Sequence, residues 1–232
     1  RKNDLIVYLA HDLKTPLTSV IGYLSLLQDE PQISKELRAK YTGIALEKAE
    51  RLEDLINEFF DITRFNLTSL SLEPERTNLS RMLEQTTSEF NLILAEKELR
   101  WRTEITPGIE ILCDPDKLGR VFDNLIRNAV SYSYDNSELF LSMRPNGEFV
   151  EIVVKNHGKT IPPDKLARIF EQFYRVDSSR SSKTGGAGLG LAISKEIVEL
   201  HGGIIRAQSE NESITFTVRL PADCHKIVRT FR

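Results

Sequence analysis

The sequence predicts an α+β protein in which an antiparallel helical hairpin precedes a layered domain of helices and strands. Apolar residues step by three or four from Leu5 to Leu27 and again from Leu37 to Ile62, as one face of a helix requires. After Asn66 the pattern changes to short alternating segments bounded by turn residues, which is typical of strands mixed with helices. A chain of 232 residues has room for two such parts.

The hairpin is expected to need a partner. A break at Asp29-Glu30-Pro31 separates its two helices, and Ser34 is a suitable N-cap for the second because its hydroxyl can accept a backbone N–H. Two helices alone leave an apolar stripe uncovered. The simplest cover is a second copy of the chain, which predicts a homodimer through residues 1–66 and a four-helix bundle.

The rest of the chain predicts the layered domain. Helices are expected at residues 79–96, 114–133, 164–173 and 189–201, and strands at 99–105, 109–112, 139–143, 149–154, 204–207 and 214–220. Pro145-Asn146-Gly147 is expected to turn between two of these strands. The expected boundaries are 1–68 for the hairpin, 69–77 for a linker with its hinge near Pro74, 78–222 for the layered domain and 223–232 for a frayed tail.

Composition sets limits on compartment and partners. The net charge of −3 gives no support to nucleic-acid binding. Cys113 and Cys224 have no metal-type spacing and are too few to staple a secreted domain, which favours free thiols in a reducing compartment. No run of about 18 apolar residues is present, and the chain does not begin with methionine. We therefore expect a soluble, cytoplasmic fragment.

The first helix contains the run His11-Asp12-Leu13-Lys14-Thr15-Pro16. Helix geometry places His11 and Thr15 one turn apart on the same face. Pro16 cannot donate an N–H to the carbonyl of Asp12, so the helix should bend beside the histidine. Asp12 can hold one imidazole nitrogen and raise the basicity of the other, which makes His11 a candidate nucleophile, although a lone histidine is more often a core or surface residue without such a role.

Three further stretches carry chemistry. In Thr184 to Ile193, Gly186, Gly188 and Gly190 alternate before a helix, which suits a phosphate although a plain flexible turn is equally compatible. Asn124 and Asn128 lie four apart on one helical face, where amide oxygens can complete a Mg²⁺ shell, although an isolated pair is more often surface amides. The stretch Val153 to Arg175 ends a strand, turns at Gly158 and finishes at a guanidinium suited to phosphate, although an arginine taken alone is more often a solvated charge.

Together, in this order and spacing, the four stretches resemble the sensor histidine kinases of two-component signalling over residues 1–222, and among them those of glycopeptide (vancomycin) resistance. The His-Asp-x-Lys-Thr-Pro run is similar to the phosphoacceptor box, and Asn124 to Ser133 to the asparagine box. Val153 to Arg175 is similar to the first glycine and phenylalanine boxes, and Gly186 to Leu191 to the second glycine box.

The resemblance implies a dimerisation and phosphotransfer bundle followed by an α/β sandwich of the kind shared with gyrase and the heat-shock-90 chaperones. It also implies ATP and Mg²⁺ as cofactors, a response regulator as partner, and a membrane sensor region upstream. By motif position, His11 would take the γ-phosphoryl group with Asp12 as orienting base, and Thr15 would position water for dephosphorylation of the regulator. The implied nucleotide-site residues are Asn124, Asn128 (also the Mg²⁺ ligand), Tyr132, Asn156, Gly158, Arg175, Gly186, Gly188 and Gly190.

Three positions depart from the family pattern. Asn156 stands where an aspartate usually accepts a hydrogen bond from the adenine amino group, and a neutral amide should do so more weakly. Thr160 replaces a glycine, and Ser131 replaces a lysine near the phosphates. These departures predict weaker ATP binding than is typical. They also support a rival interpretation as a nucleotide-sensing dimeric scaffold without kinase activity.

A second rival keeps the sandwich and makes it a conformational ATPase. That function needs a carboxylate in the asparagine-bearing helix to activate water, and it gives His11 no role. Asp123 is the nearest candidate, but it is one position from Asn124 and faces elsewhere on a helix. The kinase interpretation is the one that uses all four stretches. In it, the serine-rich segment 177–185 closes over the nucleotide as a lid.

Overall fold

A computed structural model describes residues 2–30, 32–67, 71–172, 174–176 and 188–222. The chain forms two compact units, Arg1–Ser69 and Leu70–Arg232, which we name the hairpin unit and the layered unit. The expected lid at 177–185, the tail at 223–232 and Gly186 lie outside the described residues.

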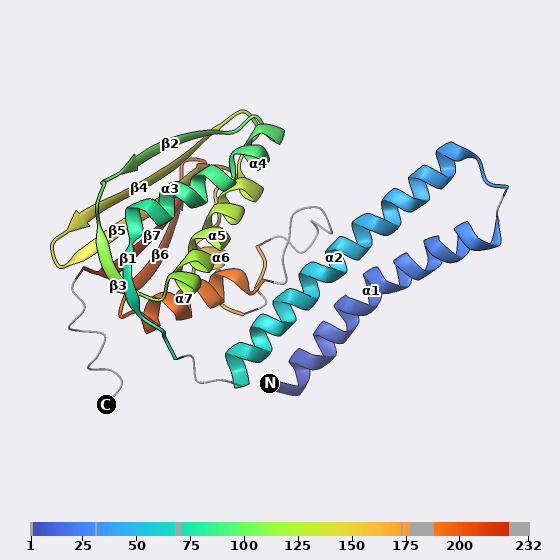
Figure 1. Cartoon of the computed structure of the whole chain (residues 1–232), viewed down its shortest axis with the longest axis horizontal. Helices are drawn as coiled ribbons and strands as arrows, with labels where there is room; N and C mark the ends of the chain where they lie inside the picture. Colours follow the sequence, from blue (N-terminus) through green and yellow to red (C-terminus); the bar gives the residue numbers. More distant parts are fainter. Residues whose placement is uncertain (1, 31, 68–70, 173, 177–187, 223–232) are drawn as a thin grey trace. The chain divides into compact units, whose positions relative to one another are not determined.

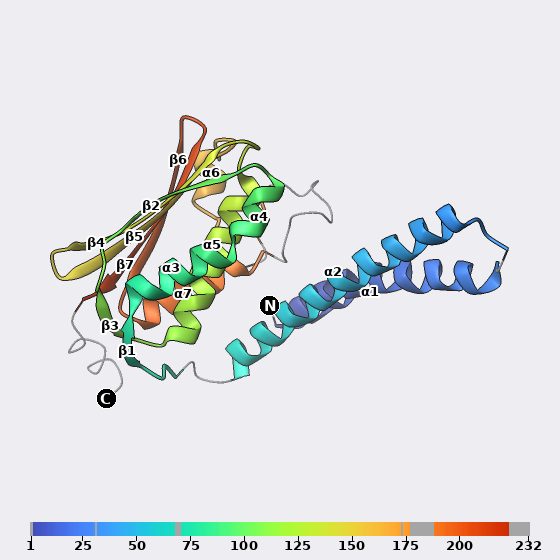
Figure 2. The same ribbon diagram turned by 45° about the horizontal axis from the view of Figure 1, so that its top comes forward.

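The hairpin unit consists of helices α1 (Lys2–Asp29) and α2 (Lys35–Leu67), which run side by side (Figures 1 and 2). The Oγ of Ser34 accepts a hydrogen bond from the N–H of Leu37 at 3.2 Å, so the predicted N-cap is confirmed. Tyr23 and Tyr41 join the two helices with ring centroids 5.4 Å apart. The predicted helical hairpin is therefore confirmed. None of the described helices is both long and apolar enough to cross a bilayer.

The helix α1 continues on both sides of Pro16, which is buried. C-terminal to Pro16, the Oγ1 of Thr18 donates to the carbonyl of Lys14 at 2.8 Å, and the Oγ of Ser19 donates to the carbonyl of Thr15 at 3.2 Å. Both acceptor carbonyls lie C-terminal to that of Asp12, which is the one that Pro16 leaves without a backbone N–H donor. The bend expected at Pro16 stays a prediction.

The layered unit is built on a five-stranded sheet in the order β2-β4-β5-β7-β6. Only the β2–β4 pair is parallel, and the other neighbours are antiparallel. A separate ribbon pairs β1 with β3. The strands are β1 (Glu75–Asn78), β2 (Arg100–Ile105), β3 (Glu110–Cys113), β4 (Glu138–Asn146), β5 (Phe149–His157), β6 (Ile204–Glu210) and β7 (Ser213–Pro221).

Helices cover one face of this sheet, as both ribbon views show (Figures 1 and 2). The long helix α5 buries Phe122, Leu125 and Ile126 completely, and Ile152 on β5 is equally inaccessible. The two-layer α/β sandwich predicted from the sequence is therefore confirmed. Its helices are α3 (Leu79–Glu89), α4 (Asn91–Glu96), α5 (Pro115–Tyr132), α6 (Pro163–Leu166) and α7 (Gly190–Leu200).

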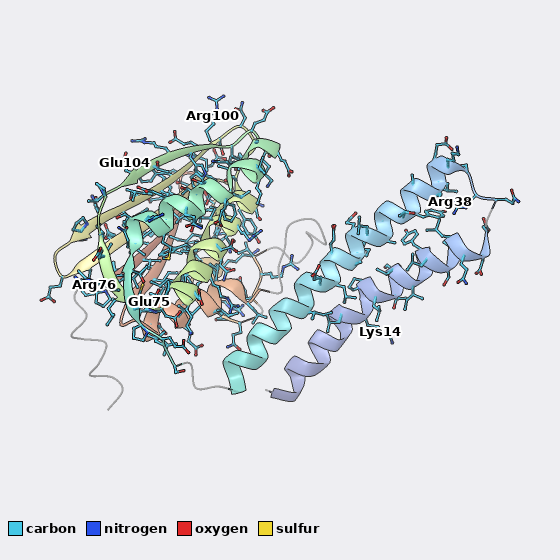
Figure 3. All side chains as sticks on the ribbon, viewed as in Figure 1. Lys14, Arg38, Glu75, Arg76, Arg100 and Glu104 are labelled. Atoms are coloured by element: carbon cyan, nitrogen blue, oxygen red, sulfur yellow. The ribbon has the colours of Figure 1, made fainter. Side chains whose placement is uncertain are left out.

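The opposite face of the sheet is polar. Glu151 is buried there between Arg144 and Arg219, whose guanidinium groups lie 2.9 and 2.8 Å from its carboxylate oxygens. Hydrogen bonds from these two arginines lower the pKa of Glu151. On the edge strand β2, Arg100 and Glu104 are exposed (Figure 3). Charged side chains on an edge strand discourage pairing with another chain.

The structure corrects several predicted boundaries. The single helix expected over 79–96 is two helices that meet at Phe90, whose ring is buried. Pro145 and Asn146 belong to β4. Of the three expected turn residues, Gly147 alone, with a φ of 63°, lies in the turn. The helix expected over 164–173 is confined to Pro163–Leu166, because backbone bonds after it are mostly of the i to i+3 type, as from Arg168 to Lys165.

The stretch 69–77, which the sequence predicts to be a linker, includes part of a strand. Residues 75–77 belong to β1, which pairs with β3. The strand β1 has only four residues, and Thr77 is the one that is half-buried. It therefore lacks the alternation of buried and exposed side chains by which a strand is recognised. Upstream, the N–H of Glu73 donates to Asp114 Oδ2 at 3.0 Å. The chain is therefore fastened to the layered unit from Glu73 onward.

Asp114 and His201 form a buried polar pair next to this fastening. Asp114 caps α5 by accepting from the N–H of Lys117 at 3.0 Å, and its own N–H donates to His201 Nε2 at 3.0 Å. His201 Nδ1 lies 2.7 Å from the carbonyl of Ile197. Burial lowers the pKa of His201, and its Nε2 accepts a hydrogen bond, so the ring is neutral. Cys113, just before Asp114, is a free buried thiol.

Candidate functional site

The candidate site residues lie on three elements of the layered unit, of which α5 packs against both β5 and α7. Asn124 and Asn128 come from α5, Asn156 from β5 and Gly190 from α7. Because α5 and α7 pack on one face of the sheet, residues that are far apart in sequence come together (Figure 1).

Asn156 is the most informative of these residues. Its side chain is only 1% exposed. Among the side chains that the structure describes, its Nδ2 is the one buried nitrogen or oxygen without a hydrogen-bond partner. Buried polar groups are almost always paired, since leaving one unpaired costs about 1–3 kcal/mol. An unpaired buried amide is a candidate contact for a ligand or a water molecule.

Gly158 lets two segments approach closely beside Asn156. A Cβ on Gly158 would lie 2.1 Å from the carbonyl oxygen of Tyr132 and 3.1 Å from Asn156 Nδ2. Its N–H donates to the carbonyl of Glu212 at 2.9 Å. Any larger residue would push the end of α5 away from β5, so this glycine is required by the packing. The ring of Tyr132 is 36% exposed.

Asn124 contacts the start of α7. Its Nδ2 donates to the carbonyl of Gly190 at 3.3 Å and to Ser194 Oγ at 3.4 Å. A Cβ on Gly190 would meet the Cγ and Oδ1 of Asn124 at 3.4 Å. Asn124 therefore fastens α5 to the first turns of α7. Ser194, which is fully buried, was missed in the sequence because a serine within an apolar helix gives no distinctive signal.

The start of α7 offers backbone donors. Its N-cap is Leu189, whose side chain has no acceptor, so the first turn has no side-chain cap. Gly188 adopts a φ of 77°, a conformation that favours glycine. A helix of 11 residues with an uncapped N-terminus suits an anionic group.

Asn128 is half-buried on α5, one turn beyond Asn124. Within the described part of the chain, no hydrogen bond of its side chain is found, and no group of three or more His, Cys, Asp or Glu side chains could hold a metal ion. A Mg²⁺ ion at this site would therefore depend on oxygens brought by a ligand, with an amide oxygen such as that of Asn128 as a supplement.

The remaining predicted residues are less completely placed. Arg175 is half-buried. Thr15 and Lys14 are exposed on α1, where Figure 3 labels Lys14. The backbone at His11 and Asp12 is helical, but their side chains lie outside the described part of the structure. The geometry therefore brings Asn124 to Gly190 and Asn156 to Gly158, and the role of His11 stays a prediction.

Two of the three departures from the family pattern have structural partners. The Oγ1 of Thr160 accepts from the N–H of Glu212 at 2.9 Å, at a turn where Glu212 has a φ of 55°. A glycine could not make that bond. Near Ser131, the Nζ of Lys97 donates to the carbonyl of Val130 at 2.9 Å. The C-terminal end of α5 thus has a cation from another part of the chain, which compensates the helix dipole.

Comparison with known proteins identifies both units. Residues 113–223 match the family described as histidine kinase-, DNA gyrase B-, and HSP90-like ATPase, and residues 1–67 match the His Kinase A (phospho-acceptor) domain. The chain belongs to the sensor histidine kinases. It is 57% identical over 221 residues to the sensor protein VanSC of Enterococcus gallinarum, which covers 95% of this chain and 61% of that protein.

A second relative of this sensor histidine kinase is the sensor protein VanS of Enterococcus faecium, which is 52% identical over 96% of this chain and 58% of its own length. The resemblance to the vancomycin resistance sensor kinases is therefore confirmed. The chain spans about three fifths of the length of these relatives. Among solved structures, histidine kinase ThkA in complex with the response regulator TrrA has a TM-score of 0.75 at 22% identity over 94% of this chain and 61% of that one.

Proposed function

We propose that this chain transfers the γ-phosphoryl group of ATP to His11 and passes it on to an aspartate of a response regulator. The observation that carries the proposal is the buried, unpaired amide of Asn156 beside Gly158 in a unit that matches an ATPase family. The phospho-acceptor domain match covers His11. In the transfer, a bond forms between an imidazole nitrogen and the γ-phosphorus, the bond to the bridging oxygen breaks, and ADP leaves.

The residues at the site fit a purine nucleotide. Asn156 offers a hydrogen bond to a base, the uncapped start of α7 offers N–H groups to phosphates, and Arg175 adds a guanidinium for phosphate charge. Asn128 would hold Mg²⁺ together with the phosphates, and the ion would neutralise charge on the transferring group. Positioning and charge neutralisation supply most of the rate enhancement in phosphoryl transfer, so the chain needs little covalent chemistry beyond His11.

The test is incubation with γ-labelled ATP and Mg²⁺ of the wild-type chain, of His11→Gln and of the matched control His225→Gln. We expect label that is labile in acid and stable in alkali, present in the wild type and the control and absent in His11→Gln. Bound nucleotide without any label would favour the scaffold interpretation. Steady phosphate release that His11→Gln leaves unchanged would favour the conformational ATPase.

We also propose that the hairpin unit forms a homodimer through residues 1–66 and receives the response regulator near His11. ThkA, which has the same fold, is described in complex with a response regulator. Thr15 is exposed on the turn after His11, where it can position water against a phosphorylated regulator. Thr15→Ala should retain autophosphorylation and slow dephosphorylation of the regulator by at least about tenfold. Equal dephosphorylation rates would remove Thr15 from this role.

The surroundings of the chain in its full-length protein are part of the same proposal. Both relatives are longer than this chain and are named sensor proteins. We infer that the chain is the cytoplasmic kinase region of a membrane sensor, in which residues outside the present sequence detect the signal. Fractionation of cells that express the full-length protein should place the kinase epitope in the membrane fraction, and recovery in the cytosol would contradict this inference.

A further inference from the structure

The turn between β6 and β7 is tied to two other segments of the layered unit through Glu212. The carbonyl of Glu212 accepts from the N–H of Gly158 at 2.9 Å, and its N–H donates to Thr160 Oγ1 at 2.9 Å. Glu212 has a φ of 55°, a conformation that is uncommon for a residue with a Cβ. Both main-chain groups of this residue are therefore used to hold the segment that follows β5.

The side chain of Glu212 is tied to Tyr134, which lies two residues after the end of α5. The phenol of Tyr134 donates to Glu212 Oε1 at 3.0 Å. The N–H of Tyr134 donates to the carbonyl of His157 at 2.8 Å. Tyr134 is therefore bound to the end of β5 by its backbone and to the β6–β7 turn by its side chain. We name these four hydrogen bonds, which link Tyr134, His157, Gly158, Thr160 and Glu212, the junction.

The junction lies beside a close contact between the segment after β5 and the end of α5. A Cβ on Gly158 would lie 2.1 Å from the carbonyl oxygen of Tyr132, so the two backbones touch there. His157 and Gly158, which take part in the junction, directly follow the buried Asn156. Tyr134 lies two residues beyond Tyr132 on the other side of the contact. The junction therefore helps to fix the ends of β5 and α5 relative to each other.

The phenol of Tyr134 and the carboxylate of Glu212 form the one bond of the junction that joins two side chains. Tyr134 is 43% exposed, and Glu212 is exposed too. The bond raises the pKa of the Tyr134 phenol, as a carboxylate acceptor should. A hydrogen bond between exposed groups contributes little to the stability of the fold, since water can replace either partner. Removing the phenol oxygen should therefore leave the fold intact and alter how firmly the segments after α5 and β5 are held.

We propose that Tyr134 and Glu212 are positioning residues of the proposed nucleotide site, which hold the segments after α5 and β5 in the arrangement that binds ATP. The inference rests on the proposed function and adds two residues to it, neither of which needs to touch the nucleotide. When the link between them opens, the fraction of chains in the binding arrangement falls, and the apparent dissociation constant rises in proportion. The bound complex itself is unchanged, so the KM for ATP should rise and kcat should stay the same.

Equilibrium titration of the 232-residue chain with the Mg²⁺ complex of ADP measures the effect on binding. Tyr134→Phe removes only the phenol oxygen, and we expect the dissociation constant to rise by roughly 3- to 10-fold, the range that one hydrogen bond can supply. Glu212→Ala should give the same rise. Glu212→Gln keeps an oxygen acceptor, so it should retain most of the affinity. Glu210→Ala, at an exposed glutamate on β6, is the matched control and should bind as the wild type does.

A double variant distinguishes one shared link from two independent effects. If the phenol and the carboxylate act through one bond, Tyr134→Phe combined with Glu212→Ala should bind no more weakly than either single variant. Effects that multiply in the double variant would contradict the link. Autophosphorylation with γ-labelled ATP supplies the second readout, in which Tyr134→Phe and Glu212→Ala should raise KM and leave kcat unchanged. A merely structural role would not produce this division between KM and kcat.

The outcomes separate this proposal from the proposed function. A Tyr134→Phe chain that is folded by circular dichroism and binds ADP as tightly as the wild type would overturn it, and so would a fall in kcat at unchanged KM. Equal weakening in Glu212→Gln and Glu212→Ala would also overturn it, because the acceptor oxygen would then have no part. Failure of the wild type to bind nucleotide would overturn the proposed function as well.

Discussion

The hairpin unit and the layered unit bury apolar side chains to very different extents. Among the hairpin side chains that the structure describes, Ala45 is the only buried apolar residue besides Pro16. Phe122, Leu125 and Ile126 of the layered unit are completely inaccessible. The large apolar side chains left 37–59% exposed on the hairpin are Leu17, Ile21, Leu24, Leu26, Leu37, Leu46 and Ile56.

This difference shows that the two units obtain their stability in different ways. The layered unit has two layers that cover each other, so it contains its own core. The hairpin has two helices and a row of exposed leucines and isoleucines, so we expect the proposed second copy to supply most of its hydrophobic stabilisation. Changes to the hairpin should therefore alter association, and changes inside the layered unit should alter unfolding.

The largest effect is expected for Ile21→Glu combined with Leu24→Glu. Both side chains are more than half exposed in the single chain, and each would contribute about 1.5–3 kcal/mol when fully buried in a dimer. The dimer dissociation constant should rise by at least about 100-fold in sedimentation equilibrium. Ser25→Glu, at an exposed polar position on the same helix, should change it little. A double variant that remains dimeric would place the interface elsewhere.

Gly158→Ala should be the most damaging small change in the layered unit. The added Cβ would lie 2.1 Å from the carbonyl oxygen of Tyr132, and backbone atoms must move to admit it. We expect a loss of about 1–3 kcal/mol in the free energy of unfolding, measured by denaturant titration. Trp101 is the only tryptophan and donates from Nε1 to the carbonyl of Thr87, so its fluorescence reports this unit.

Gly119→Ala is the matched control for that substitution. Gly119 lies within α5, and a Cβ there would meet nothing within 4 Å. Alanine should stabilise the helix by about 0.5–1 kcal/mol. If both alanine variants changed the unfolding free energy in the same direction, close packing at Gly158 would not explain its effect.

Acid should weaken the layered unit through His201. Burial lowers the pKa of this ring in the folded state, so the unfolded state binds more protons once the pH falls below about 6.5. The free energy of unfolding should therefore fall between pH 7.5 and 5.5, by at most about 1.4 kcal/mol per pH unit from this group. His201→Gln should flatten that slope. Asp114, which faces the ring, has a lowered pKa and adds its own loss only in stronger acid.

The smallest effect is expected for Thr160→Ala. It removes the hydrogen bond from the N–H of Glu212 to Thr160 Oγ1 at an exposed turn, which should cost about 0.5–1 kcal/mol. Thr160→Ser keeps the hydroxyl and should retain most of the stability. Denaturation followed through Trp101 measures both variants. Equal losses in the alanine and serine variants would mean that the methyl group, rather than the hydrogen bond, matters.

Sequence periodicity predicted the long elements well. The helices α1, α2 and α5 and the sheet strands follow repeats of three to four or two residues that continue over many positions. The strand β1 was missed because only four exposed or half-buried residues form it, and its pairing with β3 is a long-range contact. The break at Phe90 was missed because apolar spacing continues across it.

The candidate site was predictable in its membership but not in its contacts. Motif spacing identified Asn124, Asn156, Gly158 and Gly190, which the fold brings together as two pairs, Asn124 with Gly190 and Asn156 with Gly158. Asn124 holds α7, and Asn156 keeps an unpaired donor. Both facts depend on how α5, β5 and α7 pack, and local sequence does not encode such distances. Lys97 at the end of α5 was missed for the same reason, since 33 residues separate it from Val130.

Alkylation of the Cys113 thiol can report how often β3 separates from β1. Burial raises the pKa of this thiol, so in the closed ribbon it is both shielded and protonated. Alkylation requires the thiolate and access, so it reports only the moments when β3 separates from its neighbours. Peptide mapping distinguishes this thiol from Cys224. The rate at which Cys113 is alkylated therefore measures how often β1, the strand through which the chain enters the layered unit, separates from β3.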